Sequence, residues 1–197
     1  AVGMDLSLED MQTARSRIKD FSISDTNKSS CVFGAGSIQC LPFKDNLYDA
    51  VICSEVLEHL ESLDSAVSEI VRVLKPGGVL AISVPRYLPE LICWKLSPDY
   101  SKTPGGHVRI FKHKELRELI QKESVSYQSF HWAHALHSPY WWLKCIFWKN
   151  EEEHWLVKKY HEFLIWDLMK NPLITRFLEM VLKPFIGKSL VMYFVKD

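Results

Sequence analysis

The sequence lacks the cysteine pattern of a secreted, disulfide-bonded protein. It has five cysteines, an odd number, and no two of them form a C-x-x-C pair. Disulfide frameworks use even numbers of cysteines in oxidising compartments, so this pattern favours a reduced one, and we expect a cytoplasmic protein. The sequence also lacks an apolar run of the roughly 18 residues that cross a bilayer, and its first residues show no signal peptide. We expect neither a secreted nor a transmembrane protein.

An excess of one charge is also absent. Lysine plus arginine and aspartate plus glutamate each total 24, so the formal net charge is zero. Because nucleic-acid binding depends on a basic surface, we expect no nucleic acid as partner. The 197 residues are 47% hydrophobic and 24% charged, which is enough for one substantial core. The oligomeric state has no signature in the sequence.

The beginning of the first strand is missing as well. The opening residues "AVGMDLS" read as the last part of a strand that runs into a helix, and they contain no initiator methionine. We expect further chain upstream of residue 1.

What the sequence does have is an alternation of strand-like and helix-like segments. Strands are expected at residues 1–5, 30–36, 48–54 and 79–84. One helix is expected at 7–21, with Ser7 at its N-cap. A second is expected at 63–74, where apolar residues recur at helical spacing, namely Leu63, Ala66, Val67, Ile70, Val71 and Leu74.

The short segment "KPGG" (75–78) ends the second of these helices. Pro76 cannot continue a helix, and two glycines can adopt the positive φ of a C-cap and a tight turn. The run "VLAISV" (79–84) is typical of a strand buried on both faces. The alternation predicts an α/β fold with a mostly parallel sheet and helices on both faces, in which ligands bind beyond the carboxyl ends of the strands.

Four motifs in this order and spacing carry a resemblance to a known family: "VGMDLS", "GSIQCLPF", "YDAVICSEVLEHL" and "EIVRVLKPGGVLAISVP". They resemble the class I S-adenosylmethionine-dependent methyltransferases, in particular the type 11 group related to ubiquinone-biosynthesis methyltransferases. The resemblance covers residues 1–120 and includes "GGHVRIFKHKELRELI". It implies a Rossmann-like fold whose last strand is antiparallel, and S-adenosyl-L-methionine as cofactor.

The resemblance implies a nucleoside site at the ends of the first two strands. Asp5 matches the acid that accepts hydrogen bonds from both ribose hydroxyls, and Leu6 follows it. The alternative for Asp5 is a helix N-terminal acid. Ser37 stands where the family usually has an aspartate for the adenine amino group, so a charge-assisted contact is lost, although the backbone at Ile38 can still read the adenine edge.

The resemblance also implies a contact with the methionine part of the cofactor. Cys53 and Ser54 end the strand at 48–54, where relatives place backbone groups against that part of the molecule. The side chain of Cys53 can equally be a small buried hydrophobe.

In relatives the stretch "SEVLEHL" borders the methyl acceptor. Glu55 and His59 are four residues apart, so a helix starting here would place both on one face, with His59 accepting a proton and Glu55 orienting the acceptor. The alternative is a helix-start carboxylate and a half-buried histidine. His107 and Arg109 lie in a loop that closes over the pocket in relatives, and Arg109 can equally be a surface salt-bridge partner.

We expect no metal site. The methyl donor is already reactive, so the enzyme mainly aligns its substrates in a dry pocket. "HWAHALH" places histidines at 131, 134 and 137, but no nearby cysteine or carboxylate completes a ligand set. Solvated or core histidines are the better interpretation.

The C-terminal part departs from the family. Residues 124–136 and 188–197 are expected to form an antiparallel strand pair, and six of the seven tryptophans lie between 132 and 166. We expect a methyltransferase-like domain at 1–137 and 187–197, with a Trp-rich helical insertion at 138–186. The insertion is either a lid over a lipophilic acceptor, or a membrane-surface contact through Trp141, Trp142 and Trp148, or an ordinary small core.

The strand and glycine-rich loop with which the family's core begins are missing. We expect a fragment or spliced product of a longer enzyme, and the alternative is a decayed relative that no longer binds the cofactor. The leading hypothesis is methyl transfer from S-adenosylmethionine to a small, lipophilic acceptor. The alternatives are a non-catalytic binding or regulatory module and, well below it, a nicotinamide-dependent oxidoreductase, because an acid after the second strand also fits that ribose.

Overall fold

The strands form two sheets. The computed structural model describes residues 1–20, 31–150 and 154–197. In the first sheet, β1 (Val2–Asp5) pairs in parallel with β2 (Val32–Ala35). The second sheet has the strand order β3-β4-β6-β5, and its members are β3 (Tyr48–Ser54), β4 (Leu74–Pro85), β5 (Val125–Ala133) and β6 (Ser189–Lys196).

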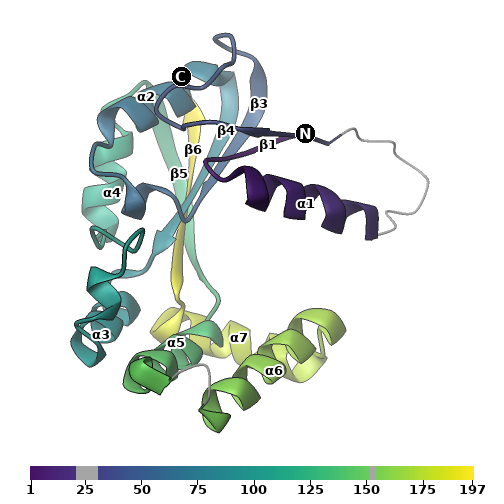
Figure 1. Ribbon diagram of the computed structural model, residues 1–197. Helices are drawn as coiled ribbons and strands as arrows, with labels where there is room; N and C mark the ends of the chain where they lie inside the picture. The colour runs from purple at the N-terminus through teal and green to yellow at the C-terminus, as the bar shows by residue number, and fades with distance from the viewer. Residues whose placement is uncertain (21–30, 151–153) are drawn as a thin grey trace.

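Helices lie between most of these strands (Figure 1). Within the described residues the α-helices are α1 (Leu8–Asp20), α2 (Asp64–Val73), α3 (Tyr87–Leu96), α4 (His113–Ile120), α5 (His137–Ile146), α6 (Trp155–Lys170) and α7 (Leu173–Ile186). Three short 3₁₀ turns are η1 (Leu57–His59), η2 (Tyr100–Lys102) and η3 (Trp148–Asn150).

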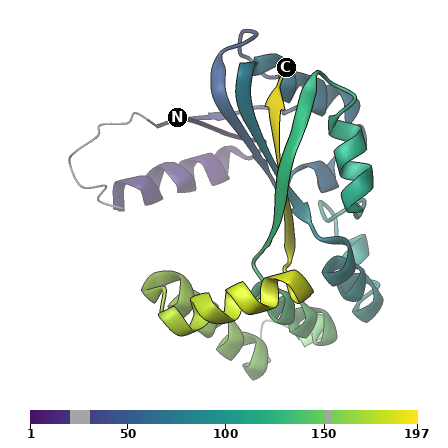
Figure 2. The same cartoon turned by 180° about the vertical axis from the view of Figure 1, so that it is seen from behind.

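The topology confirms the expected α/β class. β3 pairs with β4 in parallel, while β6 is antiparallel to both β4 and β5. The last strand in sequence is therefore the antiparallel one, and it lies between β4 and β5 (Figure 2). Short connections and amphipathic helices explain this arrangement, because each parallel pair needs a crossover segment between its strands.

The junction between α2 and β4 follows the local sequence. Gly77 has a φ of 74°, and strand pairing moves from Tyr48↔Leu74 directly to Ala50↔Val79. Residues 75–78 therefore form a bulge that lets β4 turn back beside β3 after the helix ends at Val73.

The main core lies on one face of the four-stranded sheet. Leu80, Ile82 and Val84 of β4 are fully buried and belong to a cluster that includes apolar residues of α2, α4 and β6. Val79 is 43% exposed. The expectation that this run is buried on both faces was wrong: Leu80, Ile82 and Val84 are buried, whereas Val79 is exposed and Ala81 and Ser83 are half-buried, because the described helices cover the two faces unequally.

The first sheet is separate from the second. Among the described residues β1 pairs only with β2, and no ladder joins either strand to β3. Ile52 in the middle of β3 is 78% exposed. Among the described residues, β3 therefore has a ladder partner on one edge only.

The segment between β5 and β6 is helical, as expected. α5, α6 and α7 lie beyond one end of the sheet, the end at which β4 leads into α3 (Figures 1 and 2). The carboxylate of Glu179 on α7 accepts hydrogen bonds from the backbone of Ala135 and Leu136 (2.8 and 3.1 Å), which fixes α7 to the end of β5. The division into a domain and an insertion at 138–186 stays a prediction. No described helix is long and apolar enough to cross a membrane.

Candidate functional site

The ends of β1 and β2 lie side by side. Asp5 pairs with Ala35, and the backbone N–H of Gly36 donates to the carbonyl oxygen of Asp5 (2.9 Å). The exposed Asp5 carboxylate accepts a hydrogen bond from the backbone of Ser7 (2.9 Å), and the Ser7 hydroxyl accepts one from the backbone of Asp10 (3.1 Å). Ser7 is therefore the N-cap of α1, as predicted, and part of the Asp5 carboxylate stays available to a ligand.

The loop after β2 carries the other predicted nucleoside contacts. The Ser37 hydroxyl accepts a hydrogen bond from the backbone of Gln39 (3.2 Å), and Ile38 packs against the main core. Leu6, at the end of β1, is 73% exposed. Asp5, Leu6, Ser37 and Ile38 are thus brought to one region of the molecule, although their roles stay predictions.

Arg72 of α2 holds the loop that follows Ile38. Its guanidinium donates to Glu69, to Asp45 and to the carbonyl oxygens of Leu41 and Phe43, at 2.6 to 3.1 Å. The hydrogen bond from Arg72 lowers the pKa of Glu69. A fork of donors that satisfies several acceptors fixes the path of the loop from Ser37 to β3.

Cys53 and Ser54 end β3. Cys53 is 3% exposed, and burial, together with the charge of Glu58, raises the pKa of its thiol to about 12. The thiol is a poor nucleophile in this state, and the side chain is a small buried hydrophobe, which was one of the two interpretations from the sequence. The hydroxyls of Ser54 and Ser83 lie 2.9 Å apart, and Ser83 donates to Glu55 (2.9 Å).

Glu55 and His59 do not share a helix face. Glu55 has a φ of 51°, and only the 3₁₀ turn Leu57–His59 follows it. The expected helical i, i+4 pair was therefore wrong, because a left-handed residue after β3 redirects the chain before a helix can begin. Glu55 faces Ser83, whereas His59 Nδ1 is 3.1 Å from the carbonyl oxygen of Gly106.

His59 and His107 meet around a carboxyl group that the sequence analysis passed over. His59 Nε2 is 3.8 Å and His107 Nε2 is 4.0 Å from Glu58 Oε1, and the two rings are 4.9 Å apart. Glu58 is fully buried, and burial raises its pKa to about 7. The signal for it was present, since Glu58 directly precedes His59, but a helix would have pointed it away from the site.

A second buried acid supports His107. Glu90 of α3 is 1% exposed and lies 2.6 Å from His107 Nδ1. Burial alone would raise the pKa of Glu90, but hydrogen bonds from His107 and Tyr100 bring it below its ordinary value. The side chain of Tyr100, which packs edge-on to His107, has its pKa raised by burial and by Glu90.

The guanidinium of Arg109 binds backbone carbonyl oxygens. Its Nη2 donates to the carbonyl oxygens of Leu60 and Glu61, both at 2.7 Å. The backbone N–H of Val108 donates to the carbonyl of Glu58 (2.9 Å), so the loop at 105–109 is fastened to η1. Arg109 therefore helps to position the loop that carries His107. Its guanidinium is not part of the cluster formed by Glu58, His59 and His107.

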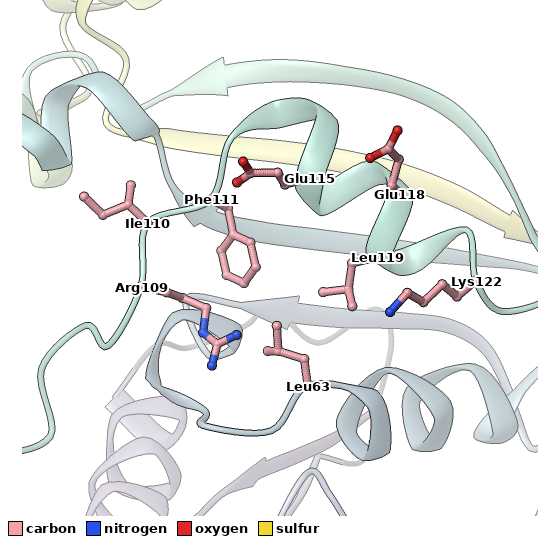
Figure 3. A pocket seen from close by; sticks show the side chains of 8 residues that line it. All are labelled: Leu63, Arg109, Ile110, Phe111, Glu115, Glu118, Leu119 and Lys122. Carbon is pink, nitrogen blue, oxygen red and sulfur yellow. The ribbon is translucent and has the colours of Figure 1, made fainter.

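Figure 3 shows an open groove of about 490 Å³ between Leu63 and α4. Arg109, Phe111, Leu119 and Lys122 are among its lining residues. Apart from Arg109 it contains none of the predicted site residues, and it lies on the helix-covered side of the sheet. The groove therefore does not coincide with the site predicted at the strand ends.

The histidines of "HWAHALH" do not form a common site. His131 of β5 stacks on Tyr193, while the rings of His134 and His137 are 5.3 Å apart. Burial lowers the pKa of both His131 and His137. In the described part of the chain, the group of side chains with metal-ligand spacing is instead Glu58, His59 and His107.

The residues fit part of S-adenosylmethionine, the cofactor that the resemblance implies. An exposed carboxylate at Asp5 and a hydroxyl at Ser37 stand at the carboxyl ends of neighbouring parallel strands. This donor and acceptor set suits a nucleoside, because ribose hydroxyls bind carboxylates well. Cys53 and Ser54 end a strand of the other sheet.

Comparison with known proteins adds independent information. A family model described as a methyltransferase domain matches residues 1–82. A sterol 24-C-methyltransferase of Schizosaccharomyces pombe is 33% identical over 106 residues, which are 54% of this chain and 24% of that protein. The chain therefore spans about a quarter of the length of this curated relative.

Solved structures share the fold over the whole chain. The YcgJ protein of Bacillus subtilis has a TM-score of 0.61 at 20% identity, over 100% of this chain and 82% of that one. The cyclase SpnF has a TM-score of 0.59 at 15% identity, over 100% and 65% of the two chains. At such identities the likeness shows the fold alone. The chain is thus similar to methyltransferase domains in sequence over residues 1–82, and to these solved structures in fold.

Proposed function

We propose that the domain transfers the methyl group of S-adenosylmethionine to a small, lipophilic acceptor. The observation that carries this proposal is the family match over residues 1–82, a segment that includes the strand ends bearing Asp5 and Ser54. The similarity to a relative named for a sterol supports the lipophilic character of the acceptor.

The residues around β1 and β2 hold the nucleoside in this proposal. Asp5 accepts hydrogen bonds from the ribose hydroxyls, and Leu6 lies against the sugar. Ser37 and the backbone of Ile38 contact the adenine edge. When bound, the cofactor supplies a methyl group on a positively charged sulfur, so the protein's task is to align the acceptor with it and exclude water.

The residues after β3 serve the acceptor. The backbone of Cys53 and Ser54 borders the methyl-bearing end of the cofactor, and Glu55 orients an acceptor hydroxyl. An imidazole nitrogen of His59 or His107 accepts the proton that such a hydroxyl releases. The exposed edge of His59, whose side chain is 36% accessible, is the side from which an acceptor approaches.

A lipophilic acceptor or a membrane surface suits the exposed face of α6 and α7. Twelve apolar residues of these helices are 39% to 80% exposed, namely Trp155, Ile165, Trp166, Leu168, Met169, Leu173, Ile174, Phe177, Leu178, Met180, Val181 and Phe185. A patch of this kind marks an interaction site on a stable protein. We propose peripheral contact with lipid through this face; a cytoplasmic location stays a prediction.

The tryptophans suggested as membrane anchors have other surroundings. Trp142 Nε1 donates to the carbonyl oxygen of Pro89 (3.1 Å), while Trp141 and Trp148 pack around the ring of Tyr100. All three are half-buried, which favours the interpretation as a small core between helices. We therefore propose that α6 and α7, and not these three tryptophans, contact lipid.

Calorimetric titration with S-adenosylmethionine and S-adenosylhomocysteine tests the cofactor proposal. We expect binding by the 197-residue chain and at least tenfold weaker binding by Asp5→Ala. Asp10→Ala, which removes an exposed acid from the first turn of α1, is the matched control and should bind like the unmodified chain. Equal affinity of the Asp5 and Asp10 variants would contradict the ribose role. Transfer of labelled methyl to a sterol in detergent micelles then tests the acceptor class.

A non-catalytic binding module is the second candidate. The separation of β1 from β3 and the serine at position 37 favour it, because both weaken the expected cofactor contacts. Failure of the folded chain to bind either cofactor form, as measured above, would support this candidate and refute methyl transfer by this chain.

A further inference from the structure

Two imidazole rings and one carboxylate converge beside the end of β3. One ligand atom from each of Glu58, His59 and His107 lies within 4.8 Å of the other two. The individual separations from Glu58 Oε1 are 3.8 Å to His59 Nε2 and 4.0 Å to His107 Nε2. These distances are too long for hydrogen bonds, so the three groups face one another without being joined.

The other nitrogen of each ring is already engaged. His59 Nδ1 is 3.1 Å from the carbonyl oxygen of Gly106, and His107 Nδ1 is 2.6 Å from the Glu90 carboxylate. A carbonyl and a carboxylate can only accept, so each Nδ1 carries a proton and donates it. In the neutral rings both Nε2 atoms therefore present a lone pair toward Glu58.

Glu58 completes the set with a carboxylate that lies within ion-pair distance of both rings but accepts no hydrogen bond from a side chain. It is 0% exposed, and neither of its oxygens has a hydrogen-bond partner. Buried carboxylates are normally paired, hydrogen-bonded or bound to a metal. Glu55 and Lys188 are the other charged groups that act on Glu58: Glu55 raises the pKa of its carboxyl group and Lys188 lowers it. The two Nε2 lone pairs and the Glu58 carboxylate thus face a common point, and no N–H or O–H group of the described residues donates a hydrogen bond to that carboxylate.

We propose that Glu58, His59 and His107 bind a divalent transition-metal cation such as Zn²⁺ or Mn²⁺. Two imidazoles and one carboxylate form a ligand set that zinc uses when it keeps an open position. Tetrahedral bonds of 2.0–2.1 Å would place the ligand atoms about 3.3 Å apart, so the separations of 3.8 and 4.0 Å from Glu58 Oε1 would contract by about 0.5 and 0.7 Å. Rotation of the partly exposed His59 side chain would shorten the first separation, and a shift of the Glu58 carboxylate would shorten the second.

The surroundings are those of a built metal site. A ligating histidine usually donates its other N–H to a carboxylate or a backbone carbonyl, which fixes the ring and raises its basicity. Glu90 does this for His107 and Gly106 does it for His59. The sequence analysis expected no metal, because it considered the histidines at 131–137 and did not consider Glu58.

The fourth coordination position opens toward solvent beside His59. It is free for a water molecule or for an oxygen atom of the acceptor. Binding of the acceptor there rests on the proposed methyl transfer. Cation binding itself does not depend on that function. With the cation bound, the two imidazoles act as ligands, and an acceptor hydroxyl bound to the cation loses its proton more readily.

Titration of the metal-free chain with Zn²⁺, Mn²⁺ and Mg²⁺ tests the site. After treatment with a chelator and dialysis, we expect one equivalent of Zn²⁺ or Mn²⁺ to bind, and Mg²⁺ to bind far more weakly because it prefers oxygen ligands. Glu58→Gln and His107→Gln should each lower the Zn²⁺ affinity at least a hundredfold, and Glu90→Gln about ten- to a hundredfold. The exposed residues Glu115 and His161 provide matched Gln controls, which should bind like the unmodified chain.

Two outcomes would overturn the proposal. One is the absence of stoichiometric binding by the folded chain, and the other is undiminished Zn²⁺ affinity in both Glu58→Gln and His107→Gln. Circular dichroism checks that each variant is folded, and Glu58→Gln is a mild change because it removes an unpartnered buried charge. The same metal-free chain is titrated separately with S-adenosylmethionine, so failure of the cofactor proposal is seen independently of metal binding.

Discussion

Replacement of Lys196 by methionine is expected to destabilise the fold far more than the loss of an ordinary surface charge. Lys196 ends β6, and its ammonium donates to the carbonyl oxygens of Val71 (2.7 Å) and Leu74 (2.8 Å) and to Asn46 Oδ1 (2.9 Å). The positive charge thus lies at the C-terminal end of α2, where it also interacts favourably with the helix dipole.

The magnitude follows from these contacts. A hydrogen bond from a charged donor contributes about 1.5–3 kcal/mol, and a cation at a helix end about 0.3–1 kcal/mol. The three acceptors are partly accessible to water, so their contributions do not add in full, and methionine keeps the apolar stem. We expect a loss of about 2–3 kcal/mol, which for a chain of this size lowers the Tm by roughly 4–12 °C.

Thermal and urea unfolding followed by circular dichroism measure this loss. Lys75→Met is the matched control, since Lys75 pairs at 2.6 Å with Asp49, whose side chain is 87% exposed. Solvent screens such a pair, so the control should change the Tm little. If Lys196→Met lowers the Tm no more than Lys75→Met does, the capping role of Lys196 is refuted.

Three further outcomes are expected. Glu55→Gly should raise the free energy of unfolding by up to about 1 kcal/mol in urea, because glycine tolerates the φ of 51° at this position. The same change should weaken turnover of the acceptor. A lower free energy of unfolding would contradict the reasoning. Iodoacetamide at pH 8 should alkylate the exposed Cys31 and Cys40 but leave Cys53 unmodified in mass spectra of the folded chain, because burial raises the pKa of the Cys53 thiol to about 12 and keeps it protonated; rapid labelling of Cys53 would refute this. Gly78→Ala should destabilise the chain by about 1–3 kcal/mol in the same unfolding assay, since its Cβ would lie 2.8 Å from the carbonyl oxygen of Lys75; an unchanged midpoint would contradict that contact.

Local patterns in the sequence were sufficient for the central elements. The spacing of apolar residues in α2 predicted the buried positions Ala66, Val67, Ile70 and Val71, all of which lie in the core. The N-cap at Ser7 and the positive φ at Gly77 were predicted from residue type alone. Each of these features depends on contacts within a few residues, which is the range that periodicity and capping rules describe.

Features that depend on distant contacts were not predictable in this way. Glu58 meets His107 only because the loop at 105–109 folds back on η1, and Glu90 reaches that histidine from a third element. The helical spacing assumed for Glu55 and His59 failed because Glu55 is left-handed. Likewise, β4 reads as buried on both faces, but how much of each face is covered depends on helices elsewhere in the chain.

The position of β6 has a consequence for how the chain folds. β6 follows every other described element in the sequence, yet it is the strand that joins β5 to β4. During synthesis β5 therefore has no partner in the sheet until the residues from Ser189 onward have left the ribosome. Sheet closure is therefore expected to be a late, long-range step, and β5 is expected to be an unpaired, aggregation-prone strand until then.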